Sequence, residues 1–207
     1  PDDEEGAEAF IKGLMDHQEK LHFALGRGRQ RASIGVHDLN TVAPPFRVVA
    51  VDGDRSFVPL AKEEPMSISN ILLHHPKGVD YAHLLDGMDR YPMILDNNDD
   101  VLSFPPIING DHTTVTRATR DFFVDVTGWD ERACEAALML VCLQLAKRGG
   151  AVESVDITTC TGETITMPNG AGKQHTVPEE LVENLLGRSF TDDEIHSAIG
   201  RMGGRFD

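Results

Sequence analysis

Hydrophobic residues recur at helical spacing in the first third of this chain. In residues 7–25 the apolar positions are separated by four or seven residues, which predicts a helix that Gly26 ends. A shorter helix is predicted over residues 66–78, where Ser67 is a suitable N-cap. The Pro-Lys-Gly segment that begins at Pro76 is expected to stop this second helix.

The longest uninterrupted helical pattern covers residues 128–150. Its first turn carries Asp130 and Glu131, and its last turn carries two basic residues followed by a glycine pair. Acidic residues at the start and basic residues at the end complement the helix dipole, and glycine favours the end of a helix. This segment is therefore the clearest helix that the sequence predicts.

Between these helices, alternating or continuous apolar runs predict a series of short strands. The predicted strands are 32–39, 46–53, 56–60, 91–95, 101–104, 113–116, 122–126, 151–159 and 163–167. The stretch VLSFPPIING, residues 101–110, has two adjacent prolines, and proline cannot donate to a sheet ladder. We interpret this pair as a rigid corner that ends a strand, with Ser103 and Asn109 on either side of it.

The pattern changes after residue 168. PNGAGK, residues 168–173, has the composition of a linker, and two short amphipathic helices follow it. Thr191 and Glu194, three residues apart, form a capping box at the start of the second helix. Two such helices are too small for an independent core, so we expect 169–207 to be a linker and the truncated start of a helical module. Residues 1–168 form the main domain, a mixed α+β unit.

Composition narrows the class of protein. No apolar run of the 207 residues approaches the roughly 20 needed to cross a membrane. The net charge of −15, from 34 acidic and 19 basic residues, argues against non-specific binding of nucleic acid. The acidic residues are spread along the chain, as in adaptation to high salt, so a specific nucleic-acid partner stays possible. Three cysteines without a disulfide or zinc spacing favour a reducing, cytoplasmic setting.

Two stretches carry candidate chemistry. Asp125 and Thr127 are two residues apart on a predicted strand, so their side chains share a face. If this strand lies beside the proline corner, several polar groups converge on an apolar-walled pocket of the kind that binds small molecules. The alternative is that Asp125 or Thr127 caps the helix that follows.

Histidines give weaker signals. His37 and Asp38 could be a base and its orienting carboxylate, but adjacent strand residues point to opposite faces, and the spacing favours a turn at a strand end. His74 and His75 are also adjacent. Adjacent side chains on a helix point in different directions and cannot both bind one metal ion, so no metal site is expected.

Several motifs together resemble the beta subunit of the archaeal and eukaryotic phenylalanyl-tRNA synthetase family. The longest are YPMILDNNDDVLSFPPIINGDHTTVT, FFVDVTGWDERA and LAKRGG, with SIGVHDLNTVAPPF and MSISNILLHHPKGVDYAHLL upstream. The resemblance is collinear from about residue 20 to the end of the chain. It implies an editing domain over residues 1–168, with layered β-sheets and covering helices in a three-layer ββα arrangement.

The resemblance also implies an activity, the hydrolysis of tyrosine that has been wrongly esterified to phenylalanine tRNA. Selection against one added hydroxyl is limited to about a hundredfold in an apolar synthetic pocket, so a second, hydrolytic site is needed. The tyrosyl pocket of the family matches Met93 (in place of leucine), Ser103, Asp125 and Thr127 here. Water is the expected nucleophile, and Asp125 and Thr127 are the candidate catalytic residues. Asn109 is expected to stabilise the corner and to belong to the tyrosyl pocket.

Partners follow from the same resemblance. The 3′ end of phenylalanine tRNA is the implied substrate, and a synthetase alpha subunit is the implied partner in an alpha2beta2 assembly in the cytoplasm, without a membrane. ATP and magnesium belong to the full synthetase, and no cofactor is expected for editing. Arg27, Arg29 and Arg31 in the GRGRQR run are candidate contacts for tRNA phosphates, and a solvated turn is the alternative. A non-catalytic module for tRNA binding or subunit assembly stays the alternative function.

Overall fold

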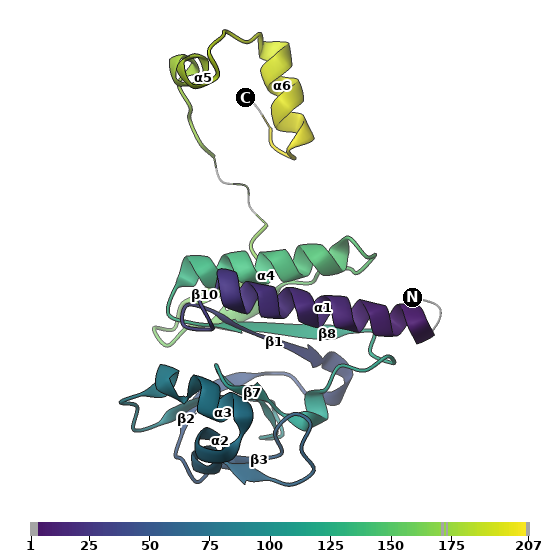
Figure 1. The fold of residues 1–207 in the computed structure, drawn as a ribbon, viewed down its shortest axis with the longest axis vertical. Helices are drawn as coiled ribbons and strands as arrows, with labels where there is room; N and C mark the ends of the chain where they lie inside the picture. The colour runs from purple at the N-terminus through teal and green to yellow at the C-terminus, as the bar shows by residue number, and fades with distance from the viewer. Residues whose placement is uncertain (1–3, 171, 173, 206–207) are drawn as a thin grey trace. The chain divides into compact units, whose positions relative to one another are not determined.

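A computed structural model describes residues 4–170, 172 and 174–205. The chain divides into two compact units, Pro1–Pro168 and Asn169–Asp207. The division falls where the PNGAGK linker begins, and two residues of that linker, 171 and 173, lie outside the described part. Figure 1 shows the course of the chain through both units.

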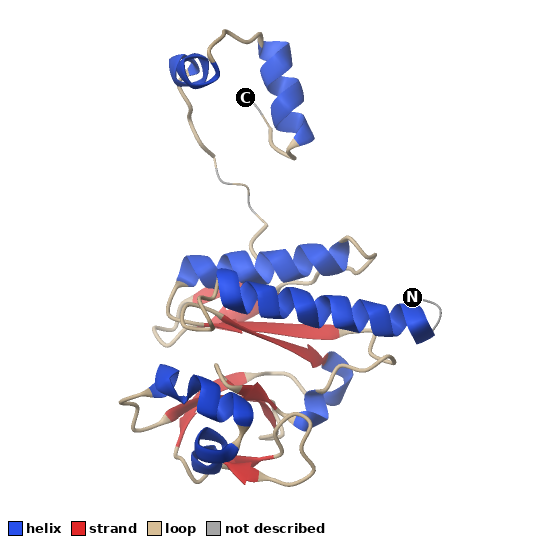
Figure 2. Ribbon diagram, viewed as in Figure 1, coloured by secondary structure: helices blue, strands red, loops and turns tan. Residues whose placement is uncertain are grey.

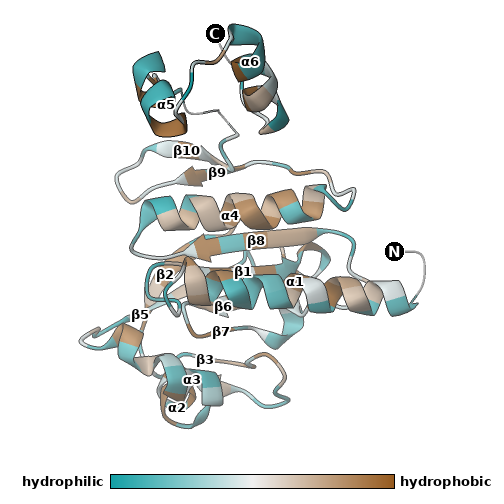
Figure 3. Ribbon diagram, turned by 45° about the horizontal axis from the view of Figure 1, so that its top comes forward, coloured by the Kyte–Doolittle hydropathy of each residue, from teal (hydrophilic) through white to brown (hydrophobic). Residues whose placement is uncertain are grey.

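One layer of the first unit combines two long helices with a pair of strands. Strands β1 (Ser33–Asp38) and β8 (Phe122–Thr127) pair antiparallel, and helices α1 (Glu4–Ala24) and α4 (Glu131–Ala146) pack against them (Figure 2). Every second residue of a strand faces the same side, so Ile34 and Val36 reach the helices together. There they join Leu14, Ala137 and Val141 in a buried cluster. Figure 3 shows hydrophobic residues on both β8 and α4.

A second layer is a four-stranded antiparallel sheet with the order β2-β5-β6-β7. Its strands are β2 (Arg47–Val51), β5 (Tyr91–Leu95), β6 (Val101–Phe104) and β7 (Ile108–Asn109). One face of this sheet covers the larger apolar cluster, with α2 (Ile68–His74), the short strands β3 (Ser56–Phe57) and β4 (Met66–Ser67), and the 3-10 turn η2 (Ala82–Leu85). The mixed α/β class and the layers of sheet and helix confirm the fold expected from the sequence.

The proline corner is the turn of a hairpin. Ser103 pairs with Asn109 and Phe104 with Ile108, so β6 runs into Pro105-Pro106 and returns as β7. The peptide bond between the two prolines is cis. Because paired residues of neighbouring strands point to the same side, Ser103 and Asn109 share the face opposite the apolar cluster.

Two predicted elements differ in the structure. The helix expected over residues 66–78 is two helices, because Pro76 begins α3 (Pro76–Tyr81) instead of ending a helix. Proline fits the first helical position, since the amide hydrogen that it lacks would be unpaired there. The preceding His75 is extended, as residues before proline prefer, and its Nδ1 accepts from the Lys77 amide at 3.2 Å.

The strand predicted at residues 113–116 is also absent from the described structure. Thr113 instead ends a 3-10 turn, η3 (Asp111–Thr113). The Thr113 hydroxyl donates to the Gly110 carbonyl at 3.0 Å, and the Thr114 hydroxyl donates to the Asp111 carbonyl at 2.5 Å. Side-chain bonds to nearby backbone compete with sheet pairing, which explains why a β-branched run became a turn.

The remaining elements are short. They are η1 (Leu39–Thr41), β9 (Val155–Thr158), β10 (Thr164–Met167), α5 (Glu179–Leu186) and α6 (Asp192–Arg201). The capping box predicted at Thr191 and Glu194 is present, with both reciprocal hydrogen bonds. Within the described residues, the helices are too short or too polar for any to span a lipid bilayer.

Candidate functional site

Strands β1 and β8 form one wall of a cleft. Asp125 pairs with Gly35 and Thr127 with Ser33, so these four residues share the face that points away from α1 and α4. All four line the cleft, which has a volume of about 240 Å³. The sequence prediction that Asp125 and Thr127 point the same way is consistent with this register.

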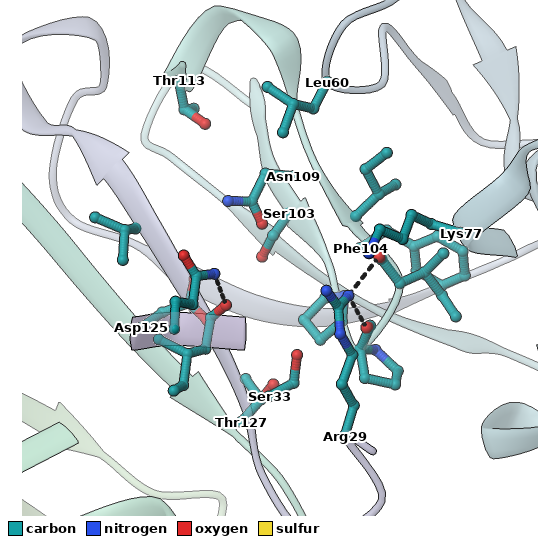
Figure 4. Close-up of a pocket in the computed structure, with 18 of the residues that line it drawn as sticks. Arg29, Ser33, Leu60, Lys77, Ser103, Phe104, Asn109, Thr113, Asp125 and Thr127 are labelled. Atoms are coloured by element: carbon teal, nitrogen blue, oxygen red, sulfur yellow. Dashed lines mark hydrogen bonds between the residues drawn. The ribbon is translucent and has the colours of Figure 1, made fainter. Parts of the chain in front are cut away.

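The β6–β7 hairpin forms the facing wall. Ser103 and Asn109 line the cleft (Figure 4). The two prolines of the turn, Ile107 and Ile108 line it too. The structure therefore brings Ser103 and Asn109 into the same cleft as Asp125 and Thr127, although the two pairs come from different sheets. Asn109 therefore lines the cleft and also flanks the proline corner.

Ser103 is the residue whose environment most directly indicates a ligand. Its side chain is only 3 % exposed, and its hydroxyl has no hydrogen-bond partner among the described residues. A buried hydroxyl that stays unpaired costs roughly 1–3 kcal/mol. A bound molecule with a polar group near Ser103 would remove that cost.

Asp125 is held by a histidine that sequence reasoning set aside. His37 Nε2 lies 2.7 Å from Asp125 Oδ2, and His37 Nδ1 lies 2.8 Å from the Thr113 hydroxyl. Asp38 turns the other way and caps η1, accepting from the Asn40 amide at 3.0 Å. The interpretation of Asp38 as a strand-end turn residue is thus confirmed, and the carboxylate partner of His37 is on β8.

The possibility that Asp125 or Thr127 caps the next helix is excluded by the cap itself. Helix α4 is capped by Asp130, whose carboxylate accepts from the Ala133 amide at 3.1 Å. Asp125 and Thr127 lie before that cap on β8 and line the cleft.

Met93 does not reach the cleft, and its expected role as a pocket wall needs correction. It is fully buried in the larger apolar cluster, on the opposite face of the sheet from Ser103. The reason is strand alternation, because Ser103 pairs with Ile94, and Met93 is the next residue along β5. The apolar walls of the cleft come instead from the hairpin turn and from Leu60.

Arg29 is also placed differently from the phosphate contact expected of it. Its guanidinium donates to the carbonyls of Pro106 and Ile107 at 3.0 and 2.9 Å and lies 4.6 Å from the centre of the Tyr81 ring. It is 9 % exposed, and because it also pairs with Glu19 it ties the β6–β7 turn to α1. Arg31 forms an ion pair with Asp130 at 3.3 Å, and Arg27 is exposed to solvent.

Charges gather at one side of the cleft around Glu19. Its Oε1 lies 3.0 Å from the Arg29 guanidinium and 3.8 Å from the Lys77 ammonium. Burial acts to raise the pKa of Glu19, but these two positive charges outweigh it and hold the pKa below its usual value. Lys77 is half-exposed and lines the cleft, so it is a cation that an anionic substrate could meet.

Comparison with known proteins gives a consistent assignment. Residues 4–143 match the B3/4 domain family over most of the first unit. The chain belongs to the B3/4 domain family. Among curated relatives, this B3/4 domain is 50% identical over 192 residues to the phenylalanine--tRNA ligase beta subunit of Methanosarcina acetivorans, covering 93% of this chain and 35% of that protein.

Other relatives carry the same name. The beta subunit of Methanococcoides burtonii is 47% identical over 197 residues, covering 95% of the B3/4 chain and 36% of that protein. The beta subunit of Thermococcus onnurineus is 40% identical over 193 residues, covering 93% of the B3/4 chain and 34% of that protein. The chain thus spans about a third of the length of these relatives.

A solved structure agrees with both the fold and the relatives. An N-terminal fragment of the phenylalanyl-tRNA synthetase beta subunit from Pyrococcus horikoshii superposes with a TM-score of 0.85 at 34% identity. The match covers 89% of the B3/4 chain and 53% of that fragment. The resemblance inferred from the sequence motifs is therefore confirmed.

Proposed function

We propose that this chain is the editing domain of a phenylalanine–tRNA ligase beta subunit and hydrolyses tyrosine from mischarged phenylalanine tRNA. Its similarity to beta subunits supports the part of the proposal that assigns the chain to such a subunit. The observation that carries the chemistry is the cleft, where an unpaired buried hydroxyl on Ser103 faces a wall bearing Asp125 and Thr127.

The cleft suits a tyrosyl group in size and in chemistry. Apolar side chains of the hairpin turn can enclose an aromatic ring, and polar side chains on both walls can pair with its hydroxyl and with the aminoacyl ester. Phenylalanine lacks the hydroxyl and would leave a buried polar partner unpaired, at roughly 1–3 kcal/mol. The site would thus bind the tyrosyl group more tightly than the phenylalanyl group, whereas an apolar synthetic pocket excludes the added hydroxyl only poorly.

In the proposed reaction, water attacks the carbonyl carbon of the tyrosyl ester. The new bond joins the water oxygen to this carbon, the bond from the carbon to the ribose oxygen breaks, and the water proton ends on the ribose hydroxyl. Asp125 and Thr127 hold the water and the tyrosyl group at the β8 wall, and Ser103 and Asn109 pair with polar atoms at the hairpin wall.

The rest of the proposal concerns the whole enzyme. The full-length subunit would work in the cytoplasm with an alpha subunit, as an alpha2beta2 assembly that ligates phenylalanine to its tRNA with ATP and magnesium. The 3′ end of phenylalanine tRNA would enter the cleft. The half-exposed Lys77 lies at the side where the phosphate backbone could be met.

The test is a paired deacylation assay on the full ligase, with phenylalanine tRNA charged either with tyrosine or with phenylalanine. We expect the wild type to deacylate the tyrosyl form faster and Asp125→Ala/Thr127→Ala to lose that preference. Ser103→Ala should lower the rate on tyrosyl-tRNA roughly 5- to 100-fold without lowering the unfolding midpoint, because it removes a hydroxyl with no protein partner.

The matched control is Asp156→Ala, an exposed aspartate on strand β9 away from the cleft. It should leave both deacylation rates at the wild-type level. Unchanged tyrosine preference in the Asp125→Ala/Thr127→Ala variant would overturn the proposed site.

A further inference from the structure

His37 makes the only side-chain hydrogen bond that the described structure gives to Asp125, and the proposed function leaves it without a role. Its side chain is completely buried, on the same face of β1 as Ser33 and Gly35. Both ring nitrogens are in contact, Nε2 with Asp125 Oδ2 at 2.7 Å and Nδ1 with the Thr113 hydroxyl at 2.8 Å. A histidine held at both nitrogens has a fixed ring orientation.

The charge on Asp125 gives the direction of one of these hydrogen bonds. An ionised Asp125 can only accept, so His37 Nε2 donates to it. At Nδ1 the partner is the Thr113 hydroxyl, which also lies 3.0 Å from the Gly110 carbonyl, and the tautomer of the ring decides which of the two atoms donates. The chain from Gly110 through Thr113 and His37 thus ends in a bond to one oxygen of the Asp125 carboxylate.

The strand leaves space for this bond at Gly35. Gly35 lies two residues before His37 on the same face of β1, and it pairs directly with Asp125. A Cβ atom built on Gly35 would lie 2.6 Å from His37 Nε2 and would overlap Asp125 Oδ2. Its φ is not in the left-handed region, so glycine is required there for space and not for backbone conformation.

We propose that His37 is a positioning residue for editing, which holds Asp125 Oδ2 so that the other carboxylate oxygen is presented to the cleft. This inference rests on the proposed function, because it assigns His37 a role in the same hydrolytic site. His37 acts through Asp125 and is separated from the substrate by it. A carboxylate that could rotate freely would hold the water or the tyrosyl group in several geometries, which lowers the rate of the chemical step.

The test compares His37→Leu and His37→Gln in the full ligase, by steady-state deacylation of tyrosyl-tRNA. His37→Leu should lower kcat roughly 10- to 100-fold with KM for the charged tRNA little changed. The amide nitrogen of glutamine can reach a position similar to Nε2, so His37→Gln should restore much of kcat. His83→Leu, at an exposed histidine of η2, is the matched control and should behave as the wild type.

Gly35→Ala keeps the proposal testable if a substitution of buried His37 prevents folding. It retains both partners but places a methyl group against their contact, and it should also lower kcat. If His37→Leu folds with wild-type kcat, or if the substitutions raise KM alone, the positioning role is wrong. If the wild type shows no tyrosine preference, or Asp125→Ala has no effect, the proposed function itself fails, and that result is distinguishable from the first.

Discussion

Three buried polar side chains of the first unit hold parts of the fold together. Arg29 satisfies the carbonyls of the hairpin turn, and His37 holds Asp125. His22 accepts a hydrogen bond from the Ile34 amide at 2.8 Å, which joins the end of α1 to β1. Ser103 alone of these four lacks a partner for its side chain within the described residues, and it faces the cleft.

His22 should make stability depend on pH. Burial, assisted by the charge of Arg29, lowers the pKa of His22 from 6.5 to about 4. The unfolded chain therefore binds a proton between these values while the folded chain does not, so stability is full above 6.5 and falls as the pH drops toward 4. Between about pH 7.5 and about pH 5 we expect the free energy of unfolding to fall by about 2 kcal/mol from this residue, measured by urea denaturation.

His22→Gln removes the titrating ring and keeps an atom that can accept from the Ile34 amide. This variant should lose most of that pH dependence, whereas the control His83→Gln, at an exposed position, should keep it. Equal pH slopes in His22→Gln and the wild type would show that another group is responsible.

At the scale of elements, side-chain caps mark where helices α2 and α4 begin. Ser67 accepts from the Asn70 amide to cap α2, and Asp130 caps α4. Asp130 also pairs with Arg31 at 3.3 Å, so one carboxylate joins the start of α4 to the segment that precedes β1. Helix α4 packs on the back of the strand that bears Asp125, and its position therefore matters for the cleft wall.

Removing the cap of α4 should weaken the first unit. Asp130→Ala leaves the Ala133 amide without its side-chain acceptor and should lower the free energy of unfolding by about 1 kcal/mol. Asp130→Ser keeps a capping oxygen and should recover most of this loss, as measured by urea denaturation at neutral pH. A loss equal to that of Asp130→Ala in the serine variant would indicate that the Arg31 ion pair, and not the cap, is the stabilising contact.

At the scale of the whole molecule, the buried apolar core lies in the first unit. Both buried apolar clusters draw their members from residues before 169. Helices α5 and α6 of the second unit contain no buried residues. The apolar side chains of Leu185 and Leu186 in this second unit are exposed.

A chain that ends at residue 168 should therefore unfold at the same temperature as the 207-residue chain, within about 2 °C. The reason is that no member of either apolar cluster is removed, and hydrophobic burial is the main favourable contribution to folding. Differential scanning calorimetry of the two chains measures this. A markedly lower unfolding temperature for the shorter chain would show that residues 169–207 stabilise the first unit.

The sequence by itself determined most of the local structure. The long helix ending near Gly26, helix α4, the capping box at Thr191, and most strands follow from spacing and caps that involve neighbouring residues only. Where the sequence preference of a residue allowed two local structures, contacts with other parts of the fold decided between them. Pro76 could stop a helix or start one, and Thr113 could extend a strand or bond back to the Gly110 carbonyl.

The site required the tertiary structure, because its residues come from strands in two different sheets. Alternation placed Asp125 and Thr127 on one face, yet it could not show that His37 reaches Asp125 across Gly35 or that Arg29 ties down the hairpin turn. A glycine two residues before a histidine, opposite an Asp-x-Thr strand, was the available signal, but only strand register shows which residues are opposite. Met93 shows the same limit, since a one-residue step along a strand moves a side chain from the cleft to the core.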